Sequence, residues 1–502
     1  MTFLDALVIT AYGVLVLGLG LYAARSHQQA GDLLLGNRSM PTWAVLFSMV
    51  ATELSAATFI GVPHAAYVGT WSYLQFAFGA LAGKLVLGAF VIPLYHRKGF
   101  VTVYGLLDER FGSRARTLAA LAFVMGRVLA SGVRLFIAAL AFSAVTDLSL
   151  TSAIVLSALI AGAYTLVGGI RSVIWTDVVQ GVVFVAAVLC VIVVLAIHPL
   201  GGLPEIATWA QAQGRMEIFT FSPALSLSSA RPFLVGLIGG FFLTLATHGT
   251  DHDMVQRLLT TSSGRAGGRA LMGSALLNFP LTALFLFVGT GIAYVLQTPP
   301  AYDIGDTARI FPIFAFHELP SGARGLLFAG LFAAAMSSFD SAVCAIATTV
   351  CSDVLPATKD AQALVKRMRL ASIGCCAALA LAAIAISKYH AALVQGQAAG
   401  ATFSLVDLAL SAMTILYGGL LGVFAVAVLM KRRGSDASAL AGIVSGSVTG
   451  ALLFLHPLLR DQLGGLEIAW PWWIPISATV SFGVTMMGRS ESETFVVADG
   501  GN

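Results

Sequence analysis

Long apolar stretches recur along the whole chain and are separated by short polar connectors. A helix needs about 20 apolar residues to cross the hydrocarbon core of a bilayer. Windows of that length occur thirteen times, so the pattern predicts thirteen membrane-spanning helices. Their approximate bounds are 3–24, 42–63, 72–95, 117–145, 149–168, 173–198, 232–257, 268–297, 323–352, 368–387, 402–430, 437–456 and 470–487.

Composition supports a lipid environment for these helices. The chain is 58% hydrophobic and only 10% charged, with a mean hydropathy of +0.88, whereas soluble domains carry about a quarter charged residues. We therefore expect an all-α integral membrane protein whose main partner is the bilayer. The net charge of +4 is mild and implies no nucleic acid, and no obligate protein partner is indicated.

The first apolar run is expected to stay in the mature protein. Asp5 precedes it and Arg25 follows it, which is the reverse of the charge order of a cleaved signal peptide. We read the run as a retained helix whose N-terminus lies outside.

Basic residues test the number and direction of the spans. With the N-terminus outside, nineteen lysines and arginines fall in inside connectors and six in outside connectors. An excess of lysine and arginine in the connectors on one side of the membrane marks the cytoplasmic face. The sequence therefore predicts a multi-pass protein of the cell membrane with a cytoplasmic C-terminus.

Two outside connectors, 199–231 and 298–322, are long. The second mixes apolar and turn residues, so we expect a short helical lid over an extracellular opening, with a plain loop as the alternative. The five cysteines all lie in or at the ends of apolar runs without metal-ligand spacing, and we assign them no disulfide and no metal.

The second predicted span carries polar residues at membrane depth. Glu53, Ser55 and Thr58 sit near its middle, and Gly61 and Pro63 follow. Glycine and proline there suggest a broken or bent helix whose freed carbonyls face a cavity. The alternative is a proline kink packed against its neighbours, with the hydroxyls bonded to their own helix.

The sixth predicted span begins with Thr176, Asp177 and Gln180 in an otherwise apolar helix. An ionisable residue inside a membrane segment is costly and usually functional. The alternative is that Asp177 complements the positive end of the helix dipole.

The ninth predicted span is interrupted by Ser337, Ser338, Asp340 and Ser341. At 100° per residue, the three serines and Ala334 share an arc of about 100°. Hydroxyls and carbonyls on one arc, opposite a broken helix, form an oxygen-lined niche that suits a hard monovalent cation. A stripe of small residues for close helix packing would explain alanine and serine, but it does not explain Asp340.

Other ionisable residues have less definite roles. Lys84 is expected to extend its amine toward the cytoplasmic face. Arg127 and Arg134 share one helix face, and a structural pair with Glu53 or a carbonyl is as plausible as substrate contact. His252 and Asp253 are expected near the inner interface.

Four stretches resemble the sodium–solute symporter family. They are "ATELSAATFIG" (51–61), "GGIRSVIWTDVVQG" (168–181), "TDHDMVQR" (250–257) and "AAAMSSFDSA" (333–342). Their order, spacing and span numbers match, and the resemblance covers nearly the whole chain.

The resemblance implies a fold of the leucine-transporter kind, with two inverted five-helix repeats and a site between them near the midplane. One extra helix precedes the repeats and two follow. The expected divisions are 1–41 (first helix and loop), 42–198 (first repeat), 199–231 (extracellular loop), 232–430 (second repeat) and 431–502 (two helices and cytoplasmic tail).

The resemblance also implies a main sodium site. It is expected to use backbone oxygens of Ala51 and Leu54, the carbonyl of Ala334, and the hydroxyls of Ser337 and Ser338.

Some family members have a second sodium site, formed by an aspartate of the sixth span and two hydroxyls of the ninth. Asp177, Ser337 and Ser341 match it, but Asp340 stands where the other hydroxyl would be. A carboxylate there could strengthen the cation site, replace its ion by a proton, or turn away to bond elsewhere. We expect Na⁺ as the coupling ion, one per cycle with a candidate second.

Substrate positions carried over by resemblance are Glu53, Ser55, Thr58, Ala77, His248 and Ser411. Sugar-transporting members place Gln or Glu at several of these, whereas Thr58, Ala77 and Ser411 are short or apolar. A hexose is therefore disfavoured, and a small organic acid or an amino acid is favoured. Glu53 could serve an ammonium group or a proton.

The function predicted from the sequence is sodium-coupled import of a small polar solute by alternating access. The alternatives are proton coupling through Glu53, Asp177 or Asp340 and, less favoured, a membrane sensor module. We expect no enzyme, because HExxH, GxSxG and interfacial carboxylate pairs do not occur in the sequence.

Overall fold

The computed structural model describes residues 1–25, 34–143, 148–165, 169–221, 225–230, 232–298, 302, 307–358, 360–396, 405–456 and 467–489. The described residues are helices and connectors, and their only β pairings are two isolated bridges, Met40 with Thr261 and Arg433 with Arg489. The prediction of an all-helical chain is therefore confirmed.

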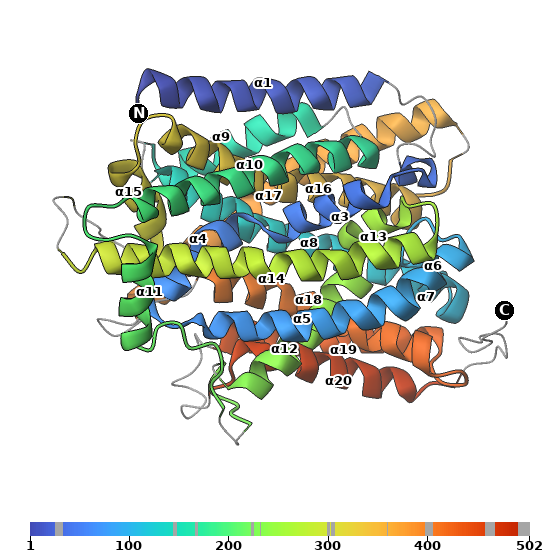
Figure 1. Ribbon diagram of the computed structural model, residues 1–502. Helices are drawn as coiled ribbons and strands as arrows, with labels where there is room; N and C mark the ends of the chain where they lie inside the picture. The colour runs from blue at the N-terminus through green and yellow to red at the C-terminus, as the bar shows by residue number, and fades with distance from the viewer. Residues whose placement is uncertain are drawn as a thin grey trace.

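Each predicted span corresponds to a helix or to a bent pair of helices. The long elements are α1 (Phe3–Arg25), α3 (Thr42–Glu53) with α4 (Ala56–Val68), α5 (Gln75–Val86) continued by α6 (Ile92–Lys98), α8 (Ser113–Ser143), α9 (Leu150–Thr165), α10 (Ile170–Ala196), α12 (Phe233–Gly249) with α13 (His252–Leu259), α14 (Gly264–Val295), α16 (Ala323–Thr349), α17 (Ala361–Gly396), α18 (Leu405–Leu429), α19 (Asp436–Leu455) and α20 (Trp473–Met486). Most of them run roughly parallel to one another (Figure 1).

Length and hydropathy qualify nine of the described helices as membrane spans, or eleven when each bent pair counts as one. The apolar part of α9 (Leu150–Gly162) is shorter than these, and α20 has 14 residues. The structure thus confirms a multi-span helical bundle.

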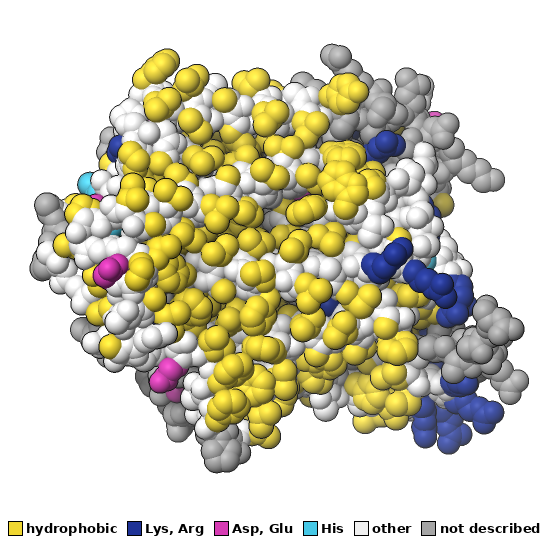
Figure 2. Space-filling view, viewed as in Figure 1, with side chains coloured by type: hydrophobic (Ala, Val, Ile, Leu, Met, Phe, Trp, Pro, Cys, Tyr) yellow, Lys and Arg dark blue, Asp and Glu magenta, His cyan; other side chains and the backbone are white. Residues whose placement is uncertain are grey.

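The bundle exposes an apolar belt. Figure 2 shows hydrophobic side chains over the middle of this face, with Lys and Arg gathered at the end that carries α6 and α7 (Gly105–Phe111). Large side chains such as Leu159, Val182 and Leu276 are more than 60% exposed. In water such a surface would be unfavourable, so it is a surface for lipid.

Two of the spans are broken in the middle. The axes of α3 and α4 differ by 57°, and those of α12 and α13 by 62°. The first break falls at Leu54 and Ser55, both outside helical geometry. Pro63 lies inside α4. The predicted break is therefore present, but it lies eight positions before the proline that suggested it.

Short helices occupy the two long connectors. The structure has α11 (Leu203–Ala212) within 199–231 and α15 (Ile310–Glu318) within 298–322. The ring of Phe311 on α15 packs 5.3 Å from that of Phe59 on α4, between ring centroids. The second connector is thus helical over 310–318, and residues 299–301 and 303–306 lie outside the described residues.

Glycine permits the closest helix contact beside the central cavity. A Cβ on Gly79 of α5 would collide with the backbone of α12, and one on Gly240 of α12 would collide with the backbone of α5. Close backbone approach through small residues is the usual way helices pack in lipid. It draws these two helices together along one wall of the cavity.

Candidate functional site

The first helix break frees backbone oxygens. Leu54 donates its N–H to the carbonyl of Val50, and Phe59 donates to the carbonyl of Ser55. Within the described residues, the carbonyls of Ala51 and Leu54 accept no hydrogen bond. Buried carbonyls without partners are rare in proteins, so these two oxygens are available as ligands.

The serine face of α16 lies against this region. Ser337 and Ser338 are each 1% exposed and Ala334 is 2% exposed. The Ser337 hydroxyl donates to Asp177 Oδ1 at 2.6 Å. The Ser338 hydroxyl has no hydrogen-bond partner among the described residues. A buried hydroxyl without a partner is costly, which is consistent with a ligand held there.

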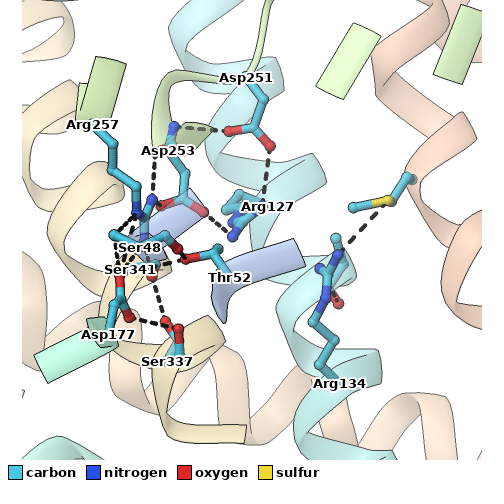
Figure 3. Close-up of polar contacts among 12 residues, drawn as sticks. Ser48, Thr52, Arg127, Arg134, Asp177, Asp251, Asp253, Arg257, Ser337 and Ser341 are labelled. Atoms are coloured by element: carbon cyan, nitrogen blue, oxygen red, sulfur yellow. Dashed lines mark hydrogen bonds and ion pairs between the residues drawn. The ribbon is translucent and has the colours of Figure 1, made fainter. Parts of the chain in front are cut away.

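Asp177 joins three helices at the predicted ion-binding region. Its Oδ2 accepts from the Ser48 hydroxyl of α3 at 2.6 Å and from the Thr52 hydroxyl at 3.5 Å. Its other oxygen accepts from Ser337 of α16. Asp177 is fully buried. It therefore does more than complement the end of its own helix, as Figure 3 shows.

Arg257 of α13 occupies the other side of Asp177. Its Nη2 lies 3.3 Å from Asp177 Oδ2, and the same nitrogen donates to the Ser341 hydroxyl. Its Nη1 donates to Oδ1 and the carbonyl oxygen of Asp253, at 2.7 and 2.6 Å. The sequence count placed Arg257 among the basic residues of an inside connector, whereas the structure buries it fully between two aspartates. An arginine close to two aspartates at the end of an apolar span was a usable signal.

A second arginine extends the network. Arg127 of α8 pairs with Asp251 through Nη1 at 3.1 Å and with Asp253 through Nη2. Tyr417 of α18 donates its hydroxyl to Asp251 at 2.5 Å. The suggested pair of Arg127 with Glu53 is therefore wrong, because two buried carboxylates of the second helix break compensate its charge.

His252 and Asp253 are not interfacial as expected. Both are at most 1% exposed. They begin α13, immediately after the break that follows α12. The bend carries this turn into the protein interior, which the position of the residues within the apolar run could not reveal.

Asp340 is buried in a different setting. It interacts electrostatically with Tyr12 of α1 and with Cys376 of α17. It is 2% exposed.

A cavity of about 750 Å³, its open mouth included, adjoins the first helix break. Helices α5, α12 and α14 form most of its wall, with Leu410 of α18 at one side. Three of the predicted substrate positions, Glu53, Thr58 and Ala77, line it. The other three are buried and are not among its lining residues: Ser55, His248 and Ser411.

Glu53 is the centre of a polar cluster at this cavity. Its carboxylate lies 2.5 Å from Lys84 Nζ and 3.1 Å from His248 Nε2. It also accepts from the Ser274 hydroxyl at 3.2 Å and from the Asn278 amide. Lys84 is 2% exposed. The expectation that Lys84 reaches the cytoplasmic face is therefore wrong, because its amine binds a buried carboxylate instead.

Arg134 lies apart from the network of Asp177, Asp253 and Arg257, as Figure 3 shows. Its Nη1 donates to the carbonyl of Ala130 at 3.2 Å, and its Nη2 lies 4.0 Å from the sulfur of Met413. No carboxylate among the described side chains lies within 4 Å of its guanidinium. Its side chain is partly exposed.

Comparisons with known proteins identify the family of the chain. A sequence model of the sodium:solute symporter family matches residues 33–446. The sodium/sialic acid symporter NanT of Aliivibrio fischeri is 30% identical over 449 residues, covering 89% of this chain and 86% of that protein. The human sodium-coupled monocarboxylate transporter 1 is 26% identical, covering 88% and 72%.

Solved structures show the same fold. A substrate-bound, outward-open Na⁺-coupled sialic acid symporter superposes with a TM-score of 0.84 at 24% identity, covering 98% of this chain and all of that one. The nucleobase-cation symporter Mhp1 in a closed conformation superposes with a TM-score of 0.57 at 16% identity, covering 92% and 94%.

Proposed function

This chain belongs to the sodium:solute symporter family, and we propose that it imports an organic acid together with sodium through the cavity beside the first helix break. Sodium-coupled symport follows from its family and relatives. The substrate class, the residues of the site and the orientation of the chain are the proposed part.

The proposed sodium site consists of carbonyl and hydroxyl oxygens. The carbonyls of Ala51 and Leu54 come from the break, and the carbonyl of Ala334 and the hydroxyls of Ser337 and Ser338 come from α16. The observation that carries the proposal is the buried Ser338 hydroxyl, which has no protein partner among the described residues. Neutral oxygen ligands suit a hard monovalent ion.

A carboxylate substrate is favoured by two charged side chains, Glu53 at the cavity and Arg134 of α8, which is not among the lining residues of the cavity. Glu53 already accepts from four donors, so it has little capacity left for a substrate ammonium, and an amino acid is disfavoured. Arg134 has no described carboxylate partner. Relatives named for sialic acid and for monocarboxylates transport anions, which supports an organic acid here.

We propose thirteen spans, with the N-terminus outside and the C-terminus in the cytoplasm of a cell-membrane protein. In this arrangement α3 to α10 and α12 to α18 are the two inverted repeats. The helices found at all thirteen predicted positions support the count. The basic end of the bundle supports the direction.

Sodium is proposed to hold the broken helix against α16 while the cavity is open to the outside. The ion binds both elements at once, so it favours the arrangement in which they touch. Coupling requires that ion and solute improve each other's affinity by the same factor. The membrane potential adds about 2.3 kcal/mol per charge per 100 mV to the sodium gradient.

Uptake into proteoliposomes tests this function. Sialic acid and a short monocarboxylate would be offered under an inward sodium gradient, with choline replacing sodium at fixed pH as the control. We expect sodium-dependent uptake of an acid and its loss in Ser337→Ala/Ser338→Ala. Uptake that continues in choline but follows an imposed proton gradient would favour the proton-coupled alternative.

A further inference from the structure

We propose that the guanidinium of Arg257 is the resident cation at the second ion position, so that each transport cycle carries one sodium. This inference rests on the proposed sodium site at Ser337 and Ser338 and concerns the number of ions bound beside it.

The oxygens of the second position belong to Asp177, Ser337 and Ser341. Arg257 already bonds to two of these side chains, Asp177 and Ser341. Arg257 donates to Asp177 Oδ2 from Nε and Nη2, at 3.4 and 3.3 Å, and Nη2 also donates to the Ser341 hydroxyl. The guanidinium thus lies where a sodium ion would bind Asp177 and Ser341 together (Figure 3).

The far side of Arg257 is fixed as well. Nη1 donates to the carbonyl and the carboxylate of Asp253, one turn earlier on α13. Its Nε lies 3.0 Å from the Ser48 hydroxyl. Arg257 is fully buried. A second cation would have to displace an arginine all of whose nitrogens have acceptors, and a displaced buried charge is strongly unfavourable.

The hydroxyls are engaged in the same network. The Ser337 hydroxyl donates its proton to Asp177 Oδ1. The Ser341 hydroxyl donates to the backbone carbonyl of Ser337 while it accepts from Arg257. Each of the three oxygen-bearing side chains therefore has a partner before any ion arrives.

Binding of radiolabelled sodium to the purified full-length chain tests the inference. We expect one sodium per chain, with a Hill coefficient of about 1. Ser341→Ala should keep that count, whereas Ser337→Ala should abolish saturable binding. Arg257→Gln that still elutes as a folded protein should raise the count toward two.

The outcomes separate this inference from the sodium site itself. Two sodiums per unsubstituted chain, falling to one in Ser341→Ala, would overturn the inference and leave sodium symport standing. A count of one in folded Arg257→Gln would overturn the role of Arg257. Absence of saturable binding in the unsubstituted chain would overturn the proposed sodium site together with this inference.

Discussion

The hydroxyl of Ser337 on α16 donates to Oδ1 of Asp177 on α10 over 2.6 Å. This bond ties the serine face to the charged network of Asp177, Arg257 and Asp253. The neighbouring Ser338 hydroxyl has no partner among the described residues. The two adjacent serines therefore differ in their contacts: Ser337 is bonded to the charged network, whereas Ser338 is not.

Ser338→Ala should weaken sodium binding about tenfold or more. Loss of one direct ligand to a cation removes about 1–3 kcal/mol, and 1.4 kcal/mol is a factor of ten. The measurement is the sodium concentration that gives half-maximal uptake. Ser131→Ala is the matched control, because Ser131 of α8 is also buried with an unpartnered hydroxyl. Equal effects of the two changes would contradict the assignment.

Arg127→Leu should destabilise the folded protein by about 3–5 kcal/mol, because it leaves buried Asp251 with no cation and Asp253 with one. Thermal unfolding in detergent measures the effect. The control is Lys98→Ala, which breaks an ion pair with Glu109 whose side chains are 35% and 36% exposed. Exposed pairs contribute about 0–1 kcal/mol. A small loss in Arg127→Leu would show that the network adds little to stability.

Lys84→Met should lower the free energy of unfolding by about 3–5 kcal/mol, since the Glu53 carboxylate would lose its ammonium partner in a nearly buried site. Glu53→Gln/Lys84→Met should recover much of that loss. A double-mutant cycle on the two residues gives their coupling energy. If the two single substitutions changed the free energy of unfolding additively, the ion pair between Glu53 and Lys84 would not be what stabilises this cluster.

Arg134→Gln should weaken uptake of a carboxylate substrate roughly 10- to 150-fold, because a hydrogen bond to a charged group contributes about 1.5–3 kcal/mol. Sodium binding measured without substrate should be unchanged. Arg134→Lys, which keeps the charge but loses the planar fork, should show an intermediate effect. Unchanged uptake in Arg134→Gln would place the substrate carboxylate elsewhere.

Most of the helices could be located from the sequence because a lipid environment restricts which segments can span it. The thirteen apolar runs match helices because backbone groups in lipid must be satisfied within a segment. The polar interruptions at Glu53, Asp177 and Ser337 were recognisable because such residues are rare at that depth. Those positions are the ones that the structure brings to the helix break, the charge network and the cavity.

Partner choice among the charged residues could not be read from the chain. Lys84 and Glu53 are 31 positions apart, and Arg127 and Asp251 are 124 apart. Helical periodicity gives the face of a residue on its own helix but not the helix opposite it. The pair of Arg127 with Glu53, suggested as one alternative, and the expected snorkelling of Lys84 were wrong for this reason.

The sequence by itself determined the lipid environment of the chain, the positions of its helices and its family. Hydropathy, span length and local motifs are properties of contiguous residues. The tertiary structure alone decided where the break falls, which carboxylate each arginine compensates, and that Arg257 reaches Asp177 and Ser341. These depend on bends of 57° and 62° within two spans and on the packing of distant helices. Which charged side chains lie in contact depends on how distant helices pack. These contacts decide which polar groups are already bonded and which can bind an ion or a substrate.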